Sequence, residues 1–422
     1  MFKRIMCLGL AISIAFSVCC RQVKAEEITE KTEETTETVD EMIENYDEEM
    51  AEIDEMYRNL EITLPEEEFV WEEEKKTIAV NSNARATISV PKGICTSGTA
   101  TGTAIIQDMT NACAKTYVSE SSGIKTSFSF GEQLKDSFVI PGMKNTNVKG
   151  FSCNAMIPQG ITYHDGYYFV TAYCGEREHD SVIYVIDGSS KKYITTLVLV
   201  LDKDPHLGGI TYANGYLWLC DTRQKTDTTP KESFVYYYTY SEIKEAILYA
   251  KNNSSVKSIS LANYTYGCAD ITNHGSASFI TTYNGYLCIG EYESDFYGKG
   301  NIRYYYPKPT SSGTLGYFAI CEIPPLAQGI DFYVSINHTY IILTASWGYL
   351  DSTIYVYKKS GTSMSGTLHN RKIMKFPCKL EEVIINGNTT YFIFESCAKK
   401  YRLLSRPVIG AACGFNTNYI LK

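Results

Sequence analysis

Three segments of the chain share one pattern: PQGITYHDGYYFVTAY (residues 158–173), LGGITYANGYLWLCDT (residues 207–222) and ASFITTYNGYLCIGEY (residues 277–292). Each combines a short strand rich in Ile and Thr, a polar turn and an aromatic strand. The turns are Asp-Gly or Asn-Gly, which strongly indicate a β-hairpin because both central residues must adopt positive φ. Weaker copies occupy residues 327–346 and 380–396. The sequence therefore repeats one hairpin five times.

Further predicted strands follow each hairpin. Third strands are expected from Ser181, Ser233, Asn301, Ser352 and Ala398. Fourth strands are expected from Lys191, Lys257, Gly316 and Arg371. The last hairpin lacks a fourth strand, and DSFVIPG from Asp136 is expected to supply it and close a ring. Successive repeats start about 50–70 residues apart, and such spacing with four strands each is typical of β-propeller blades.

We therefore predict an all-β fold, a β-propeller with five visible four-stranded blades over residues 136–408. A sixth, degenerate blade within the irregular segment 81–135 stays open. A β-sandwich of unrelated hairpins is disfavoured, because a sandwich does not require the same residue at the same offset in every unit. Residues 409–422 are expected to form a C-terminal tail.

The N-terminus has the features of a signal peptide over residues 1–25. Lys3 and Arg4 precede an apolar run of about 15 residues, shorter than the ~20 that span a bilayer. Val23-Lys24-Ala25 fits a cleavage site. We expect a secreted, extracellular protein without a transmembrane segment after cleavage.

The next segment, residues 26–80, is expected to be an acidic leader that is disordered or partly helical. Residues 26–76 contain 22 acidic and 4 basic side chains. Such charge blocks are usually solvated. The remaining body is only mildly basic, with scattered charges, which argues against a nucleic-acid partner.

Eleven cysteines remain after removal of residues 1–25. They contain no Cys-x-x-Cys pair and no Cys/His cluster at zinc spacing. Some are expected to pair in an exported protein. Cys174 and Cys397 occupy equivalent positions in the first and last repeats, where they would form a disulfide across the ring closure or remain two unpaired thiols.

The order of the inner-strand motifs resembles the TolB-like and gluconolactonase-like group of six-bladed propellers, closest to uncharacterised secreted bacterial members. The matching motifs are Gln159-Gly160, His206-Leu207-Gly208-Gly209, Gln328-Gly329 and Glu381-Glu382. Glu382 departs from the glycine expected in the last repeat. The resemblance implies a divalent ion at the channel mouth that polarises an ester or lactone.

Equal offsets in equal repeats predict which side chains share a ring around the channel. The inner strands begin with Gln159, Gly208, Ser278, Gln328 and Glu381. The second strands end at Ala172, Asp221, Glu291, Ala345 and Glu395. Because calcium prefers several carboxylate and amide oxygens, the candidate metal ligands are Glu381, Glu291, Glu395 and Asp221. The alternative is that each carboxylate caps a strand end and pairs with Lys or Arg.

His206 and His274 both precede an inner strand, so they are candidate catalytic bases or ligand contacts. Gln159, Gln328 and Asp221 are the candidate ligand-binding residues. No serine-hydrolase, metalloprotease or nucleotide-binding motif occurs in the chain.

The sequence is compatible with two functions. The first is a secreted binding module that holds a small molecule, a glycan or a protein at the channel face. The second is a calcium-dependent lactone or ester hydrolase. The first is favoured because two of the five positions in the second ring are alanine.

Overall fold

The computed structural model describes residues 62–63, 116–121, 124–143, 146–148, 151–201, 205–223, 231–271, 275–308, 313–360, 367–402, 405 and 407–422. All of them belong to one compact unit, Asp54–Lys422. The predicted signal peptide and most of the acidic leader lie outside these residues. Among the described residues, no helix has both the length and the apolar character needed to cross a membrane.

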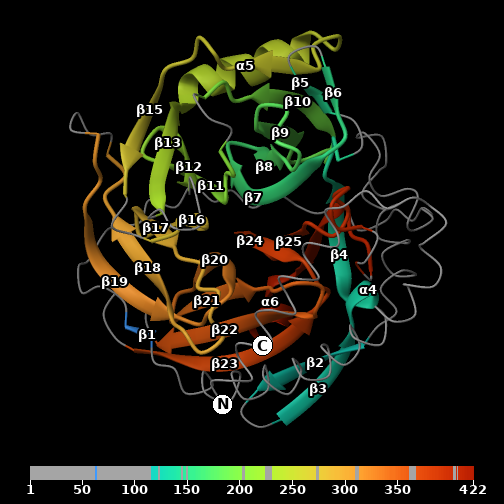
Figure 1. Ribbon diagram of the computed structural model, residues 1–422. Helices are drawn as coiled ribbons and strands as arrows, with labels where there is room; N and C mark the ends of the chain where they lie inside the picture. The colour runs from blue at the N-terminus through green and yellow to red at the C-terminus, as the bar shows by residue number, and fades with distance from the viewer. Residues whose placement is uncertain are drawn as a thin grey trace, which may run out of the picture. The chain divides into compact units, whose positions relative to one another are not determined.

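The unit is a five-bladed β-propeller, in which each blade is an antiparallel sheet built around the predicted hairpin (Figure 1). Blade one contains β7 (Met156–His164), β8 (Tyr167–Cys174), β9 (Val182–Asp187) and β10 (Tyr193–Val198). Blade two contains β11 (Gly209–Ala213), β12 (Tyr216–Arg223), β13 (Glu232–Thr239) and β15 (Tyr266–Asp270). Blade three contains β16 (Phe279–Tyr283), β17 (Tyr286–Gly290), β18 (Gly300–Tyr305) and β19 (Tyr317–Ile323).

Blades four and five complete the ring. Blade four contains β20 (Ala327–Val334), β21 (His338–Ala345), β22 (Ser352–Ser360) and β23 (Thr367–Phe376). Blade five contains β24 (Leu380–Asn386), β25 (Thr389–Phe394), β26 (Ala411–Asn416) and β4 (Leu134–Val139). The inner strands β7, β11, β16, β20 and β24 contact one another in turn, and β24 contacts β7. The ring is therefore closed.

The hairpin turns have the geometry that their sequence predicts. The φ angles are 49° and 82° at Asp165-Gly166, and 48° and 85° at Asn214-Gly215. Asn284-Gly285 has 49° and 80°. Positive φ at both central residues matches the right-handed twist of the paired strands, which is why Asn or Asp with Gly occurs there.

Closure uses a strand from each side of the ring, as the sequence predicts. Strand β4 overlaps the first four residues of the predicted segment DSFVIPG. It pairs with β26, and Ala412 lies opposite Phe138. The prediction that the third strand of blade five begins at Ala398 is, however, wrong. This strand lies at Ala411–Asn416, within the segment expected to be a tail, and it is followed by α6 (Thr417–Leu421).

Blade two also differs from its prediction. The expected fourth strand from Lys257 is β14 (Ser258–Ser260), which adds to blade one by pairing in parallel with β10. The fourth strand of blade two is β15. Between β13 and β14 lies α5 (Tyr240–Asn252), which the repeat does not predict and which buries Ile243 and Ile247 in the core between blades one and two.

The described part of residues 81–135 does not make a sixth blade. Strands β2 (Thr116–Ser121) and β3 (Ile124–Ser129) extend blade four beyond β23. Strand β1 (Ile62–Thr63), from the predicted leader, also pairs with β23. The short helix α4 (Phe130–Gln133) then leads into β4.

The apolar core lies between neighbouring blades. Between blades four and five, Phe130 packs edge-on against Phe376 and Phe415 with ring centroids 5.1 Å and 5.0 Å away. Burial of aromatic and β-branched side chains between sheets explains why alternate positions of the aromatic strands are core. A hairpin of β5 (Thr146–Val148) and β6 (Phe151–Cys153) precedes blade one.

Candidate functional site

Three inner strands contain an irregularity at the same place. The pairing register shifts between Pro158 and Ile161 in β7, between Ala327 and Gly329 in β20, and between Leu380 and Val383 in β24. A bulge of this kind redirects side chains and is frequent beside functional sites. The residues within the shifts are Gln159-Gly160, Gln328 and Glu381-Glu382.

Glycine at the bulges allows the inner strands to approach closely. A Cβ on Gly160 would lie 2.6 Å from the Cα of Gly209, and one on Gly329 would lie 2.2 Å from Oε1 of Glu382. The repeated glycines therefore serve close packing of the inner strands. In blade five, Glu382 takes the glycine position and fills the space that Gly329 leaves.

Glu381 and Glu395 form a hydrogen-bonded pair, both only 6 % exposed. Gln159, from blade one, donates from Nε2 to Oε1 of Glu395 at 2.6 Å. Burial and the neighbouring Glu395 raise the pKa of Glu381 well above its ordinary value, and burial also raises the pKa of Glu395. Two carboxylates at close range repel each other, so one of them binds a proton more tightly than an isolated carboxylate does. The pair therefore keeps a proton to higher pH than an ordinary glutamate does.

Three half-buried tyrosines, Tyr173, Tyr292 and Tyr401, surround this pair. Burial, and the negative charge of the Glu381 and Glu395 pair, raise the pKa of each phenol. Tyr173 and Tyr401 are also hydrogen-bonded to each other. The rings supply apolar faces and phenolic hydroxyls beside the carboxyl pair.

Cations stand at the edge of the same cluster. Lys379 Nζ lies 4.0 Å from the centroid of Tyr401, and Lys400 Nζ lies 5.0 Å from it. The positive charge of Lys379 opposes part of the rise in the pKa of Glu381 and Glu395. We call the set Gln159, Tyr173, Tyr292, Glu381, Glu395 and Tyr401 the carboxyl mouth.

His206, a candidate base, lies at the carboxyl mouth. Its ring is 4.2 Å from that of Tyr173, and its side chain is open to solvent. The protein around the ring displaces water that would hydrate its charged form, and the cations Arg177 and Lys400 lie nearby. Both effects lower the pKa of His206 to about 4. The ring is therefore neutral at physiological pH. His274, the other candidate base, lies outside the described residues.

Asp221 and Glu291 have partners of their own. Asp221 is fully buried; its carboxylate accepts the backbone N–H of His206 at 2.8 Å and the Arg223 Nε–H at 3.0 Å. Glu291 accepts from Asn301 Nδ2 at 3.1 Å, with the Arg303 guanidinium 4.0 Å away. Of the four predicted metal ligands, only Glu381 and Glu395 are bonded to each other. Gln328 is half-buried within its bulge.

The opposite end of the channel contains a cavity of about 600 Å³ that the sequence did not lead us to expect. Thr162, Thr211, Thr281 and Asp331 line it at one equivalent position of blades one to four. A signal for it is present in the sequence, because each follows the Ile of a Gly-Ile-Thr-like triplet. His164 also lines the cavity, stacked on Tyr212 with ring centroids 3.3 Å apart.

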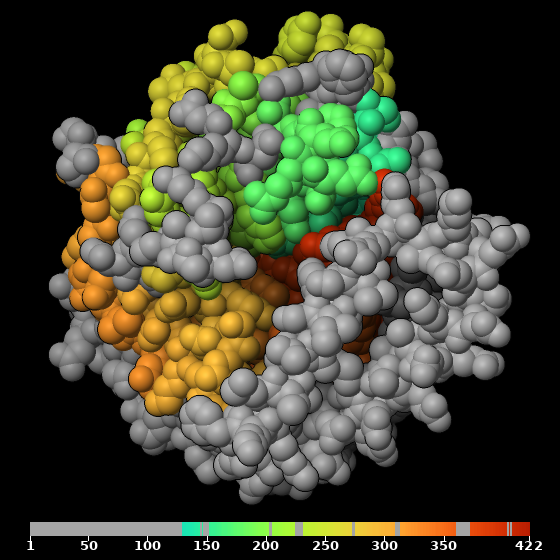
Figure 2. Space-filling view, in the orientation of Figure 1, coloured from blue at the N-terminus to red at the C-terminus, as the bar shows by residue number. Residues whose placement is uncertain are grey.

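Glu382 reaches the same cavity. Its Oε1 accepts the backbone N–H groups of Ile330 and Val383 at 3.1 Å and 3.0 Å, while Oε2 is buried without a hydrogen-bond partner. Burial and the nearby Asp331 raise the pKa of Glu382 well above its ordinary value. The bulge in β24 thus divides two adjacent glutamates between the two ends of the channel. In Figure 2, red atoms of blade five lie deep between the green atoms of blade one and the orange atoms of blade four.

Neither alternative predicted for Cys174 and Cys397, a disulfide between them or two unpaired thiols, is correct. Cys397 is disulfide-bonded, whereas Cys174 is a free thiol. The Cys174 Sγ instead lies 3.7 Å from the Cys153 Sγ.

No family model matches the chain, and no curated protein matches it. Solved structures with a similar arrangement include a GH43 β-1,3-galactosidase, with 9% identity over 66% of this chain and 59% of that chain, at a TM-score of 0.38. A xylan β-1,4-xylosidase from Bacillus halodurans C-125 has 12% identity over 61% of this chain and 51% of its own, at 0.35. A GH43_1 enzyme from Xanthomonas citri complexed with xylose has 8% identity over 67% and 90%, at 0.38.

These likenesses concern the fold alone. The chain spans just over half the length of the first two structures. The β-propeller is shown by the five sheets themselves. The TolB-like or gluconolactonase-like resemblance stays a prediction, and the six blades of that group contrast with the five formed by the described residues.

Proposed function

We propose that the protein is an exported β-propeller that binds a polyhydroxylated ligand, a glycan or a related small molecule, at the carboxyl mouth. The observation that supports this is the buried, hydrogen-bonded pair of Glu381 and Glu395, held by Gln159 from the neighbouring blade. Strongly shifted titratable groups cluster at functional sites more often than elsewhere.

The chemistry of the carboxyl mouth suits sugar hydroxyl groups. A hydroxyl both donates and accepts, and a carboxyl–carboxylate pair beside an amide offers both functions in a small space. The rings of Tyr173, Tyr292 and Tyr401 provide the apolar surface on which the C–H faces of a sugar can pack. A mainly apolar lining with a few placed polar groups is typical of small-molecule sites.

Binding is favoured over glycoside hydrolysis by the separation of the two carboxyl groups. Hydrolases that use two carboxylates keep them about 5–9.5 Å apart, so that substrate, and in some cases water, fits between them. Glu381 and Glu395 are in direct hydrogen-bond contact. They therefore act as one recognition unit, not as separate acid and nucleophile.

The alternative, a calcium-dependent lactone or ester hydrolase, has less support from the residues present. Calcium requires about six to eight oxygens around one point. Both oxygens of Asp221 are engaged by His206 and Arg223, and Arg303 stands 4.0 Å from Glu291. Two of the four predicted ligands therefore already have basic partners that compete with a calcium ion.

The test is isothermal titration of the mature chain with a panel of oligosaccharides, including β-1,4-linked xylose and β-1,3-linked galactose oligomers. Glu395→Gln should weaken binding of the best ligand at least about tenfold, since a hydrogen bond to a charged group is worth about 1.5–3 kcal/mol. Glu381→Gln, which keeps a donor to Glu395, should have a smaller effect.

His164→Phe is the matched control, because His164 lines the cavity at the other end of the channel. Its affinity should equal that of the parent protein. Loss of binding in His164→Phe but not in Glu395→Gln would move the ligand to the cavity. Absence of binding by every oligosaccharide would overturn the proposed function.

A further inference from the structure

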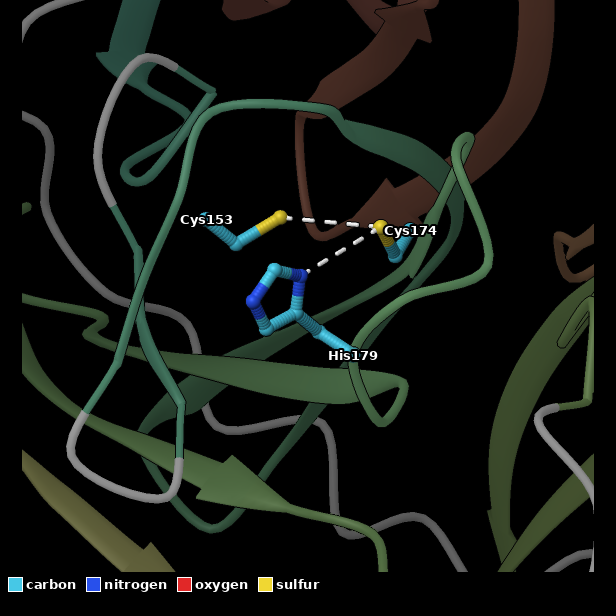
Figure 3. A group of neighbouring side chains, drawn as sticks. All are labelled: Cys153, Cys174 and His179. Atoms are coloured by element: carbon cyan, nitrogen blue, oxygen red, sulfur yellow. Dashed lines mark hydrogen bonds between the residues drawn. The ribbon is translucent and has the colours of Figure 1, made fainter.

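Cys153, Cys174 and His179 come together where β6 and β8 end, beside the β5–β6 hairpin (Figure 3). One potential ligand atom from each residue lies within 4.8 Å of the other two. The Cys153 and Cys174 sulfurs are 3.7 Å apart, and the Cys174 Sγ is 3.7 Å from the His179 Nδ1. Both cysteines are buried, and His179 is half-buried.

These separations match the edges of a tetrahedral metal site. Zinc binds thiolate sulfur at about 2.3 Å and imidazole nitrogen at about 2.0–2.1 Å. With tetrahedral angles, these bond lengths place two sulfurs about 3.8 Å apart and a sulfur and a nitrogen about 3.6 Å apart. Little movement of the side chains is therefore needed to admit an ion.

Tertiary pairing, and not sequence spacing, assembles the cluster. Cys153 ends β6 and Cys174 ends β8, where it lies opposite Met156. Gly175 N donates to the carbonyl of Ala155 at 2.9 Å, which ties the two ends together. The following turn brings His179 back, with a bond from Arg177 N to the Cys174 carbonyl at 3.0 Å and a φ of 57° at Arg177.

Backbone N–H groups point at both sulfurs. Ala155 N lies 3.5 Å from the Cys153 Sγ. The Cys174 sulfur accepts hydrogen bonds from the backbone of Glu178 and Glu176, and the His179 ring lies beside it. N–H groups that donate to sulfur favour the thiolate, which is the form that binds metal.

We propose that Cys153, Cys174 and His179 bind a divalent transition-metal ion, with Zn²⁺ as the preferred occupant. Two thiolates and one imidazole suit zinc, and a water molecule can supply the fourth ligand. On binding, the two thiol protons are released to solvent, and neutral His179 contributes the lone pair of Nδ1. The ion would attach the β5–β6 hairpin to blade one. Cys174 directly follows Tyr173 of the carboxyl mouth, but the proposed metal site shares no residue with it and does not depend on the proposed function.

The test is the zinc content of the mature protein, purified under reducing conditions, loaded with ZnCl₂ and dialysed against metal-free buffer. We expect inductively coupled plasma mass spectrometry to find one zinc ion per chain. Cys153→Ser and Cys174→Ser should lose it, and His179→Ala should bind zinc at least about tenfold more weakly, since even residues that only support a metal ligand contribute tenfold or more. Cobalt(II) in place of zinc should show the absorption of tetrahedral thiolate coordination.

Cys268→Ser is the control, because Cys268 is an exposed thiol in β15, distant in sequence from the cluster. It should retain one zinc per chain. Circular dichroism of each variant excludes unfolding as the cause of zinc loss. Zinc binding that is unchanged in Cys153→Ser and Cys174→Ser, or a disulfide between these two cysteines in the zinc-loaded protein, would overturn the proposal.

Discussion

The Nζ of Lys191 lies 3.2 Å from the Oδ2 of Asp136, and this ion pair joins blade one to the strand that closes blade five. Lys191 also donates to the hydroxyls of Tyr168 and Tyr391 at 3.0 Å and 2.9 Å. Tyr391 in turn donates to Asp136. Asp136 and Tyr391 are separated by 255 residues in the chain. One ammonium group thus connects the two sides of the ring closure.

Replacing Lys191 with Met should destabilise the propeller by about 2–3 kcal/mol, because Asp136 is left with a largely buried charge and no cation. Chemical denaturation of the full chain measures this difference. Lys244→Met is the control: its partner Asp165 lies 2.7 Å away, but both side chains are more than a third exposed. That variant should lose far less stability, because solvent screens an exposed ion pair. Equal losses in the two variants would contradict a special role for the closing ion pair.

Gly160→Ala should destabilise the ring by about 1–3 kcal/mol, the usual cost of overpacking. The added Cβ would meet the Cα of Gly209 at 2.6 Å and the N of Ile210 at 2.8 Å, and both are backbone atoms of the next blade. Gly316→Ala is the matched control, since nothing lies within 4 Å of its Cβ position. Thermal unfolding should leave the control within about 0.5 kcal/mol of the parent. A neutral Gly160→Ala would show that the inner strands are not in close contact there.

The carboxyl mouth should make stability depend on pH. The pKa of Glu381 is raised in the folded protein, so its contribution is fully present below its ordinary pKa of 4.5. That contribution is lost as pH rises through the raised value, because the unfolded chain then binds fewer protons than the folded one. The slope is at most about 1.4 kcal/mol per pH unit for one group.

Glu381→Gln isolates this effect, because glutamine keeps the donor to Glu395 but cannot titrate. The variant should gain stability relative to the parent as pH rises above about 6.5. Above pH 6.5 the titration of His206 and His164 does not contribute. Their pKa values are lowered to about 4 in the folded protein, so they reduce its stability only as pH falls below their ordinary value of 6.5. Parallel pH profiles for variant and parent would show that Glu381 is not protonated in the fold.

Calcium binding by Asp221, Glu291, Glu381 and Glu395 remains a prediction from the sequence that a titration can decide. Calcium at about a hundredfold excess over its dissociation constant would raise the free energy of unfolding by about 2.7 kcal/mol. From the arginine partners of Asp221 and Glu291 we expect no such increase. An increase that Glu381→Gln removes would restore the calcium site and the hydrolase alternative.

The sequence by itself determined the repeat, the turns and the closing strand. Asp165-Gly166 and its equivalents carry local information, since only a few residue types accept positive φ at both central positions of a tight turn. The closing strand at Asp136 follows from the number of predicted strands, because the last repeat lacks a fourth strand of its own. The ring of Thr162, Thr211, Thr281 and Asp331 is also readable from the repeat, since the four residues stand at one offset in their hairpins.

Only the tertiary structure decided which of the aligned side chains meet. The repeat places Asp221, Glu291 and Glu395 at equal offsets, but each carboxyl group has a different partner. Arg223 lies beside Asp221, Arg303 beside Glu291 and Glu381 beside Glu395. Strand β26 and the cluster of Cys153, Cys174 and His179 likewise depend on segments brought together by ring closure and hairpin packing. Hydrogen-bond partners and buried charges are selected by distances between remote segments, and those distances exist only once the ring has closed.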